Sequence, residues 1–594
     1  MRISDRIAEL LVENDVSKVF MVTGGGAMHL NDALSRNENL EIINMHHEQA
    51  CTMAAEGYAR LSNKTACVNV TTGPGGINAI NGVFGAWTDS VPIIVISGQV
   101  KRETLNYKNS DLRQLGDQEN DITGMVKDIT KFSYILKNPD LVDNVLDYSI
   151  KIAKSGRPGP VWIDVPIDIQ GATYNNKKQK QIFKFNEEKI KLKDKKSIDL
   201  LVDKLKKSKR PAIIAGGGIR ASKSYDQFLE FVDNISIPVL TAWGAHDLLE
   251  DSHKNYCGRP GTVGDRSGNF IVQNCDLLLV LGSRLNIRQI GYNFNEFSPN
   301  SFKAMVDIDN SEMNKRTLNI DLKINTDLKD FFSAIKPSLK QINNIKHDSY
   351  LEWCKNLKES YPVFRNEFEK SKLVNPYNFV NKLFSTLNEK DVVVTSDGTA
   401  VVTTFQGAKI KKNQRLFSNS GSASMGYGLP AAIGACISNN RKMTICIEGD
   451  GSLQQNIQEL ATVTYHKLPL KLFVLSNDGY HSIRQTQTNY FPDNIVGCGL
   501  ESGLYFPDLK LIAKSYNLDY ILIENSSDLI TGLKKAFKDD KALIIEIKID
   551  KSQSFEPKAS SKIYKNGVMK SAPLHDLAPF LDHAEIESII NFEN

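Results

Sequence analysis

Short apolar runs rich in β-branched residues recur along this chain of 594 residues. Most of them are bounded by glycine, asparagine or proline, and amphipathic helical stretches lie between them. Continuous apolar strands that alternate with helices are typical of parallel sheets buried on both faces. We therefore predict an α/β fold built from several doubly wound parallel sheets. The predicted strands cover residues 67–71, 92–97, 161–166, 211–216, 276–282, 391–396, 443–449, 471–477 and 543–548.

Two polar stretches divide the chain. Residues 174–196 are rich in lysine and weakly periodic, and acidic residues interrupt the lysines, which favours a solvated linker over an arm that binds nucleic acid. Residues 338–372 are rich in asparagine, lysine and glutamate. The predicted blocks are 1–175, 197–337 and 373–550, followed by a tail, 551–594, in which no strand is predicted.

Composition narrows the class of protein further. Hydrophobic residues make up 41% and charged residues 24%, as in an ordinary globular protein, and the net charge of +4 gives no argument for nucleic acid or an anionic membrane as partner. We expect no membrane-spanning helix, because no run of about 18 apolar residues occurs, and the N-terminus lacks the pattern of a signal peptide. The eight cysteines show no metal-ligand spacing, so we expect a reducing, cytoplasmic location.

The strongest chemical signal lies in the third block. One predicted strand ends in Gly449-Asp450-Gly451, and the next predicted strand ends in Asn477. Ligands bind at the carboxyl ends of strands in open α/β sheets, so Asp450 and Asn477 can meet there. Their oxygens suit Mg²⁺, the glycines let a diphosphate approach the backbone, and a predicted helix over 452–466 offers free N–H groups.

This arrangement resembles the motif of thiamine-diphosphate enzymes, GDG followed after a couple of dozen residues by Asn. The resemblance implies that the backbone carbonyl of Gly479 is the third protein ligand of the metal, beside Asp450 and Asn477. It further implies that the turn after the strand binds the cofactor through Gly449, Asp450, Gly451 and Ser452.

Thiamine chemistry needs a carboxylic acid at the aminopyrimidine ring of the cofactor, so that a ring nitrogen can remove the C2 proton. The string HEQACTMAAEGYAR contains Glu48 at a predicted strand-to-helix junction. It is similar to the segment around the activating glutamate of acetolactate-synthase-like enzymes, which implies that role for Glu48. His46 and His47 are assigned no role.

Two more segments resemble this family in the same order. SNSGSASMGYGLPAAIGA implies that Met425 is the apolar prop between the cofactor's rings, and that backbone groups of Ala423 and Met425 contact the aminopyrimidine. TTGPGGINAINGVFGAWTDSVPIIVISGQV implies that the turn at Gly73 lies near the active site and that Gln99 faces the groups bound at C2.

The middle block begins with RPAIIAGGGIRAS, a strand followed by a glycine-rich turn, and resembles the flavin-binding central domain of acetolactate synthase. The resemblance implies FAD, with the arginines at its diphosphate and Asp309 at a ribose. A central domain without cofactor stays open, because GSRLNIR matches the family's GxRFDDR only in part. The implied FAD residues are Gly217, Thr241, Gly261, Thr262, Gly282, Arg284, Arg288, Asp307 and Asp309.

The chain is thus identified as a member of the thiamine-diphosphate-dependent enzymes, similar to the large catalytic subunit of acetolactate synthase. The resemblance implies three doubly wound domains: a pyrimidine-binding domain (1–175), a central FAD domain (197–337) and a diphosphate- and magnesium-binding domain (373–550). It also implies a homodimer or a dimer of dimers, in which Glu48 of one subunit and Asp450 of another face one cofactor.

The family decarboxylates a 2-keto acid, here expected to be pyruvate, and transfers the two-carbon unit to a carbonyl acceptor. No histidine occurs between His47 and His246, which disfavours release of free aldehyde as the main activity. Thr486 stands where the synthases carry tryptophan, and residues 101–121 also depart from their pattern. Transfer to a keto-sugar nucleotide in polysaccharide biosynthesis therefore stays open, as does a flavin-dependent 2-keto acid oxidase.

A catalytically inactive paralogue is a further alternative. The residues that carry the chemistry argue against it, because all of them are present: Glu48, Met425, Asp450 and Asn477.

Overall fold

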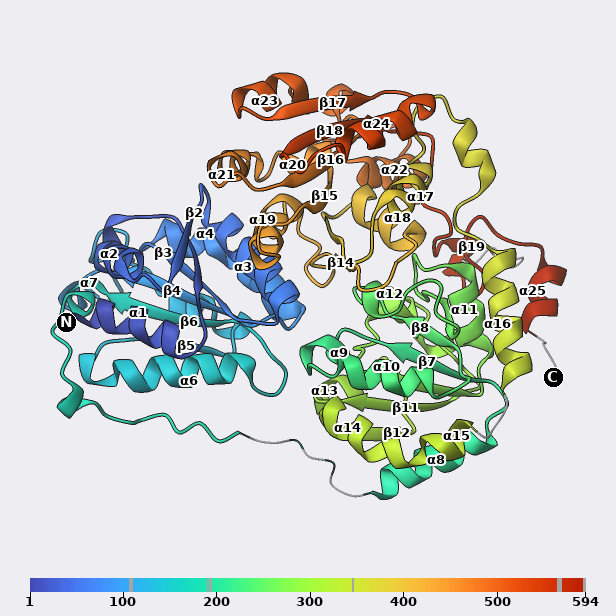
Figure 1. Cartoon of the computed structure of the whole chain (residues 1–594), viewed down its shortest axis with the longest axis horizontal. Helices are drawn as coiled ribbons and strands as arrows, with labels where there is room; N and C mark the ends of the chain where they lie inside the picture. Colours follow the sequence, from blue (N-terminus) through green and yellow to red (C-terminus); the bar gives the residue numbers. More distant parts are fainter. Residues whose placement is uncertain are drawn as a thin grey trace.

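The structure is a computed structural model that describes residues 1–105, 111–187, 190, 192, 195–343, 347–563 and 569–590. It contains three six-stranded sheets whose strand pairs are all parallel, each sheet flanked by helices (Figure 1). This confirms the predicted α/β class, and every strand predicted from the sequence is present. The predicted segments 101–121, 174–196, 338–372 and 551–594 lie partly outside the described residues.

The first domain carries the sheet with strand order β2-β1-β3-β4-β6-β5. Its strands are β1 (Lys18–Met21), β2 (Glu41–Asn44), β3 (Ala66–Val70), β4 (Ile93–Gln99), β5 (Phe132–Ile135) and β6 (Val161–Pro166). Its helices are α1 (Ile3–Glu13), α2 (Met28–Arg36), α3 (Glu48–Ser62), α4 (Pro74–Thr88), α5 (Ile122–Met125), α6 (Val142–Lys154) and α7 (Ile167–Gln170).

The central domain has the order β12-β11-β10-β7-β8-β9. Its strands are β7 (Pro211–Ala215), β8 (Val239–Thr241), β9 (Tyr256–Gly258), β10 (Leu277–Leu281), β11 (Phe302–Asp307) and β12 (Leu322–Asn325). Its helices are α8 (Lys196–Lys207), α9 (Gly218–Ala221), α10 (Tyr225–Asp233), α11 (Arg266–Asn274), α12 (Ile287–Ile290), α13 (Asn310–Met313), α14 (Leu328–Ile335), α15 (Leu339–Asn343) and α16 (Asp348–Ser360).

The third domain repeats the strand order of the first, here β14-β13-β15-β16-β18-β17. Its strands are β13 (Val392–Thr395), β14 (Arg415–Phe417), β15 (Thr444–Gly449), β16 (Leu470–Ser476), β17 (Asp519–Ile523) and β18 (Leu543–Lys548). Its helices are α17 (Pro376–Thr386), α18 (Thr399–Gly407), α19 (Gly428–Ser438), α20 (Asp450–Leu453), α21 (Leu460–Tyr465), α22 (His481–Tyr490), α23 (Leu509–Ser515) and α24 (Leu529–Ala536).

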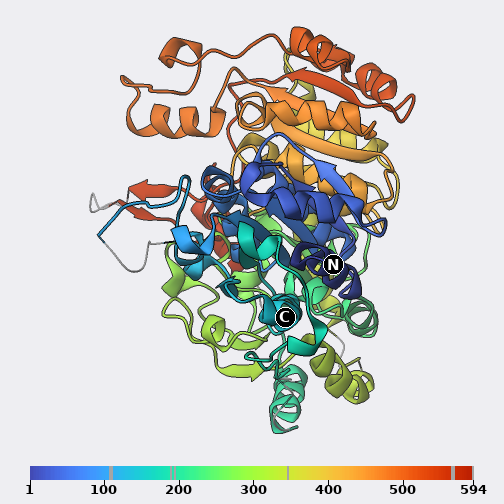
Figure 2. The same ribbon diagram turned by 90° about the vertical axis from the view of Figure 1, so that its left-hand side faces the viewer.

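One hydrophobic core spans the first and third domains, each of which also has a core of its own, whereas the central domain has a separate core. Helices α3 and α19 pack against each other at the shared boundary (Figure 1). A Cβ on Gly57 would lie 2.2 Å from the carbonyl oxygen of Ala431, and one on Gly434 would lie 1.8 Å from that of Ala54. Only glycine permits so close an approach of two backbones. Figure 2 shows the first domain in front, between the third domain above and the central domain below.

Two predictions were wrong. The single helix expected over 452–466 is broken into α20, a 3₁₀ turn at Ile457–Glu459 and α21. Asn456 breaks it, because its backbone lies outside the helical region (φ −143°, ψ 28°) and its side chain donates to the carbonyl of Gly426 at 2.7 Å. The tail, expected to lack strands, forms the antiparallel pair β19 (Ser561–Ile563) and β20 (Met569–Ser571), followed by α25 (His583–Ile590).

The connection between the first and central domains lies along the first domain. Oδ1 of Asn144 accepts hydrogen bonds of 2.8 Å from the backbone N–H groups of Ile182 and Phe183. The ring of Phe183 packs edge-on against Phe132, with ring centroids 5.0 Å apart. Among the described residues, no helix is both long and apolar enough to span a membrane.

Candidate active site

The two residues expected to meet at the sheet edge do so. Strands β15 and β16 are paired neighbours, so their carboxyl ends adjoin, and Asp450 directly follows one while Asn477 follows the other. The Asp450 carboxylate accepts hydrogen bonds from the backbone N–H of Asn477 at 3.0 Å and of Gly479 at 3.2 Å. A single carboxylate therefore organises the whole turn that was expected to hold the metal.

The chemistry of this turn fits a hard cation. The side-chain Oδ1 of Asn477 is buried and has no hydrogen-bond partner, which is an unusual state for a buried amide oxygen. Burial raises the pKa of Asp450 to about 6, and a bound cation would favour its charged form. Asp450, Asn477 and the carbonyl of Gly479 offer the oxygen ligands that Mg²⁺ prefers. Elsewhere in the described chain, His, Cys, Asp and Glu form no group of three that could hold a metal.

Gly479 is required by the backbone of this turn. Its φ is +121°, a region that side chains disfavour, and a Cβ there would lie 2.1 Å from the carbonyl oxygen of Cys498. Arg484, which the sequence did not single out, donates to the carbonyls of Asn477 at 2.9 Å and of Asp478 at 2.6 Å. Its guanidinium therefore fixes the outer side of the turn.

The loop around Met425 is fastened to the same turn. The N–H of Gly426 donates to Oγ of Ser452 at 2.8 Å, and Ser452 lies two residues after Asp450. Ala423 is held at φ +56°, and its N–H donates to the carbonyl of Asn419 at 2.8 Å. Met425 is half-buried. The structure thus brings Met425 beside the turn that carries Gly449, Asp450, Gly451 and Ser452.

Glu48 is the first residue of α3 and is buried. Nδ2 of Asn78 donates to its Oε2 at 3.0 Å, and Nδ1 of His47 caps the helix by accepting from the N–H of Gln49 at 3.0 Å. A carboxylate at a helix N-terminus is stabilised by the helix dipole. Asn78 orients Glu48 from α4, and nothing in the local sequence signals this pairing.

Helix α4 also contacts the third domain. Oγ of Ser424, next to Met425, donates to Oδ1 of Asn81 at 3.0 Å. Asn78 and Asn81 are one turn apart, so one helix face holds Glu48 and the Met425 loop. Among the described residues, no hydrogen bond joins Glu48 to Asp450.

Gln99 ends β4, and its side chain is fully engaged by the protein. Its Nε2 donates to Oδ2 of Asp164 at 2.9 Å and to the carbonyl of Asn120 at 3.0 Å, while its Oε1 accepts from the N–H of Val100 at 3.0 Å. Both N–H donors are therefore used. Asp164 was not singled out from the sequence, although a charged residue inside the apolar strand VWIDVP is a visible signal.

Gly73 is the residue before α4 and has φ +65°, the conformation expected of a glycine turn. Its carbonyl accepts from Nδ2 of Asn120 at 3.4 Å, and a Cβ on it would lie 2.7 Å from the carbonyl oxygen of Gln118. The end of segment 101–121 thus lies directly over Gly73 and Gln99.

Comparison with known families identifies this architecture. The chain matches three models: the thiamine pyrophosphate enzyme N-terminal TPP binding domain over residues 1–125, the central domain over 198–335, and the C-terminal TPP binding domain over 397–547. The chain belongs to the thiamine pyrophosphate enzymes.

Relatives cover nearly the whole chain. The acetolactate synthase large subunit of Cyanidium caldarium is 31% identical over 564 residues, which is 93% of this chain and 94% of that protein. That of Lactococcus lactis subsp. lactis (strain IL1403) is 31% identical over 558 residues, 93% of each chain. The isozyme 1 large subunit of Escherichia coli (strain K12) is 28% identical over 558 residues. The protein is a thiamine-diphosphate-dependent enzyme of the acetolactate synthase-like, C–C bond-forming kind.

In this thiamine pyrophosphate enzyme the strand order of the central sheet reverses between β7 and β10. Open α/β sheets bind ligands at such a point. Gly217 follows β7 and Gly282 follows β10, and a Cβ on Gly282 would lie 2.9 Å from Cα of Gly218. A Cβ on Gly217 would meet nothing within 4 Å. Two closely packed glycine turns with one open face fit a nucleotide. Thr241 and Asp307 end the neighbouring strands β8 and β11.

The remaining central residues have protein partners. Oδ2 of Asp309 accepts from Nη1 of Arg157 at 2.9 Å, an ion pair with the first domain that sequence reasoning missed. Burial raises the pKa of Asp307 to about 6. Arg284 lies 3.9 Å from Asp89, and Arg288 stacks over the ring of Trp243 at 5.0 Å.

Gly261 and Thr262 lie beside Arg288. Gly261 has φ +143°, and the N–H of Thr262 donates to the carbonyl of Arg288 at 2.8 Å. Both residues therefore shape the backbone next to that arginine.

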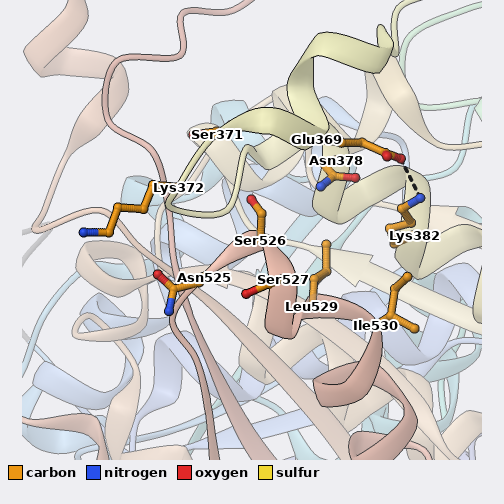
Figure 3. A pocket seen from close by; sticks show the side chains of 10 residues that line it. All are labelled: Glu369, Ser371, Lys372, Asn378, Lys382, Asn525, Ser526, Ser527, Leu529 and Ile530. Carbon is orange, nitrogen blue, oxygen red and sulfur yellow. Dashed lines mark hydrogen bonds and ion pairs between the residues drawn. The ribbon is translucent and has the colours of Figure 1, made fainter.

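A surface pocket of about 430 Å³ lies elsewhere, between α17 and the start of α24. Figure 3 shows Glu369 and Lys382 paired at its rim, with nitrogen and oxygen 2.6 Å apart, and Ser526 and Ser527 on the opposite side. None of the expected site residues lines it. The candidate site is therefore defined by converging strand ends and loops.

Proposed function

We propose that this enzyme decarboxylates pyruvate and transfers the two-carbon unit to a carbonyl acceptor, using thiamine diphosphate and Mg²⁺. The observation that carries the proposal is the buried, unpartnered Oδ1 of Asn477 beside the carboxylate of Asp450. A metal bound there would coordinate Asp450, Asn477 and the carbonyl of Gly479. When bound, thiamine diphosphate supplies the carbon nucleophile and the electron sink of the reaction.

Glu48 supplies the proton that activates the cofactor. Its carboxyl is buried at the start of α3 and oriented by Asn78, so one oxygen is fixed while the group can share a proton with a ring nitrogen. Met425 supplies an adaptable apolar surface next to the diphosphate turn. Ala423 and Met425 offer the backbone groups that would position the aminopyrimidine.

The acceptor is proposed to be a second keto acid. The relatives are named acetolactate synthases, and they do not favour the keto-sugar nucleotide or the oxidase. Thr486 lies on the exposed side of α22, with its Oγ1 donating to the carbonyl of Ser482 at 3.1 Å. A small polar residue at this position leaves space beside the site, which is why larger acceptors belong in the test.

FAD is proposed to bind at the β7–β10 edge of the central domain. The support is the pair of glycine turns at Gly217 and Gly282, with Arg284 and Arg288 on the segment that follows β10. The absorbance spectrum of the purified protein tests it, and a protein that is colourless after incubation with FAD would overturn it.

A homodimer, or a dimer of dimers, is proposed from two exposed apolar faces. Helix α4 exposes Ile77 and Phe84, seven residues apart and therefore on one side of the helix, with Trp87 beside them. Exposed apolar groups of this kind mark interfaces. The third domain also exposes several apolar side chains between residues 483 and 505, namely Ile483, Tyr490, Phe491, Val496, Leu500 and Tyr505.

A second copy would cover both faces by a twofold arrangement.

The proposed location is the cytoplasm, because the eight cysteines are all free thiols, and a reducing compartment keeps them so. No nucleic acid or membrane partner is proposed.

Mass spectrometry of the products decides the reaction. The enzyme, loaded with thiamine diphosphate and Mg²⁺, is given pyruvate alone and pyruvate with 2-ketobutyrate or a keto-sugar nucleotide. Acetolactate from pyruvate alone supports the proposal, whereas a product found only with the sugar nucleotide would replace the acceptor. Bleaching of the flavin by pyruvate without oxygen, with no ligated product, would indicate an oxidase.

A further inference from the structure

Asp397 lies at the edge of the third sheet, next to the candidate metal site. Strand β13 ends at Thr395, which pairs with Ile447 of β15, and the N–H of Ser396 donates to the carbonyl of Ile447 at 2.9 Å. The carboxyl ends of β13 and β15 are therefore adjacent. Because the strand order reverses between these two strands, Asp397 and Asp450 stand on the two sides of the point where such sheets bind ligands.

The carboxyl group of Asp397 is buried without a partner for one of its oxygens. The residue is 9% exposed, and Oδ2 makes no hydrogen bond. Burial raises the pKa of Asp397 to about 8, and Glu448, Asp89 and Glu56 act in the same direction while the Arg288 guanidinium opposes them. A carboxyl with this raised pKa keeps its proton at neutral pH and has an O–H to donate.

Three elements converge around this acid. The next residue, Gly398, starts α18 with φ +84°, and a Cβ on it would have Oγ of Ser482 on α22 as its nearest neighbour, at 3.9 Å. Arg288 of the central domain acts on the same carboxyl, and its own guanidinium rests on Trp243. The turn of Asp397 therefore faces α22, whose Thr486 was assigned to the acceptor side, and α12 (Ile287–Ile290) with Arg288.

We propose that Asp397 is a further catalytic residue, the acid that protonates the carbonyl oxygen of the acceptor while the new C–C bond forms; this inference rests on the proposed carboligase function. The transferred carbon bonds to the acceptor's carbonyl carbon, and the C=O π pair moves to oxygen. That oxygen takes the proton of Asp397 and becomes a hydroxyl, leaving a carboxylate.

Asp397 regains its proton within one turnover. When the product leaves, the hydroxyl of the transferred unit becomes a ketone, and its proton returns to Asp397. The positive charge of Arg288 stabilises the carboxylate in the interval. Asp397 is unchanged after a turnover, and the overall reaction takes up one proton from water, the one that the donor's carbonyl oxygen gained when the donor was bound; no oxidant or reductant is consumed.

Asp397→Asn tests the proposal, because the amide keeps the shape and a hydrogen-bond donor but transfers no proton. In a single turnover the rate of CO₂ release from pyruvate should stay within about twofold of wild type, whereas the rate at which ligated product forms should fall by about 10²-fold, the lower range for a positioned acid. Wild-type ligation should decline as pH rises through about 8. The variant should lose that decline.

The matched control is Asp391→Asn, on the segment that enters the same strand. Asp391 accepts from the N–H of Asn388 at 2.7 Å and lies at the opposite end of β13. Both steps should be unaffected in this control. Asp397→Glu, which retains an acid, should recover part of the ligation and its pH dependence, and thermal unfolding identifies any variant that fails to fold.

A second readout needs no turnover. Infrared difference spectra of the cofactor-free protein between pH 6.5 and 9 should show a larger loss of protonated-carboxyl absorption in wild type than in Asp397→Asn, because only wild type contains the Asp397 carboxyl. Calorimetry should give the same thiamine diphosphate affinity for both proteins.

Two results would overturn the proposal: an equal loss of CO₂ release and of ligation in a single turnover, or unchanged ligation in Asp397→Asn. A wild-type protein that releases no CO₂ and does not exchange its C2 proton would instead refute the proposed function itself.

Discussion

Oδ2 of Asp164 accepts a hydrogen bond of 2.9 Å from the side-chain amide of Gln99, and this pair lies inside the first domain at the carboxyl edge of its sheet. The other oxygen of Asp164 accepts from Oγ of Ser97 at 2.6 Å. The buried aspartate thus fixes the orientation of the Gln99 side-chain amide, whose other N–H donates to the carbonyl of Asn120 near the end of segment 101–121.

Replacing this aspartate should destabilise the protein. Asp164→Leu leaves the buried donors of Gln99 and Ser97 without a partner, and an unpaired buried donor costs about 1–3 kcal/mol. Urea unfolding should show a loss in that range or above it, with Asp164→Asn losing less. Asp168→Asn, which removes an exposed ion pair with Arg102, is the control and should lose less than about 1 kcal/mol. Equal losses at both positions would contradict the role given to Asp164.

Removal of the metal-site carboxylate should weaken cofactor binding. Asp450→Ala takes away the one charged ligand and the acceptor that orders the N–H groups of Asn477 and Gly479. Calorimetry should show a fall in thiamine diphosphate affinity of at least about 10-fold, relieved only by a large excess of Mg²⁺. Asp478→Asn is the neighbouring control, since that exposed carboxylate pairs with Lys551. If both variants bound the cofactor like wild type, the magnesium assignment would be refuted.

Glu48→Gln isolates the activation of the cofactor from the unknown acceptor. Glutamine can keep the contact with Asn78 but cannot exchange a proton, so C2–H exchange with deuterium should slow by about 10²–10⁴-fold while thiamine diphosphate still binds. NMR after acid quench measures the exchange. Asn78→Ala should slow it less, because the acid remains but is less well oriented. Exchange at the wild-type rate in Glu48→Gln would move the activating role elsewhere.

Mixed dimers test the shared site. Glu48→Gln and Asp450→Ala subunits are each expected to be inactive on their own. Co-expression should restore activity at about a quarter to a half of the active sites, because each heterodimer contains one site in which both Glu48 and Asp450 are intact. Verified heterodimers without activity would contradict a cofactor held between two subunits.

Ile77→Glu and Phe84→Glu, on the exposed face of α4, should separate the subunits in analytical ultracentrifugation.

The folded protein should lose stability as the pH rises above 5. Burial raises the pKa of Asp164 and of Glu56 to about 7, above the ordinary values of 3.8 and 4.5. Between about pH 5 and pH 7 the folded state therefore binds more protons than the unfolded state. The free energy of unfolding falls with increasing pH in this range, by up to about 1.4 kcal/mol per pH unit for each proton. Urea unfolding at several pH values measures the slope. Asp164→Asn should flatten it, and an unchanged slope would show that this group does not titrate differently on folding.

The fold and the centre of the site followed from local patterns. Apolar runs located nine of the eighteen strands in the three sheets. The position of Asp450 and Asn477 at neighbouring strand ends was sufficient to bring them together, because parallel strands share one carboxyl edge. The place of Glu48 at the start of α3 followed in the same way, since a strand-to-helix junction is visible in the sequence, whereas its role was taken from the family resemblance.

The supporting side chains did not follow from the sequence. Asn78 reaches Glu48 from another helix, and Arg157 reaches Asp309 from another domain, so their pairing depends on tertiary packing. The helix after Asp450 was predicted as continuous because its residues favour helix, but Asn456 gains a hydrogen bond to Gly426 that only the folded loop provides. Such tertiary hydrogen bonds outweigh the intrinsic helix propensity of the segment.

The path of the chain between the first and central domains has a practical consequence. The first domain shares its core with the third, so the peptide link that leads into the central domain is not what holds the first domain in place. Lys177, Lys178, Lys180 and Lys184 on this link are exposed. Brief digestion with trypsin should therefore yield two fragments on a denaturing gel that co-purify as one particle under native conditions. The same independence would allow the enzyme to be produced as two separately encoded halves that reassemble.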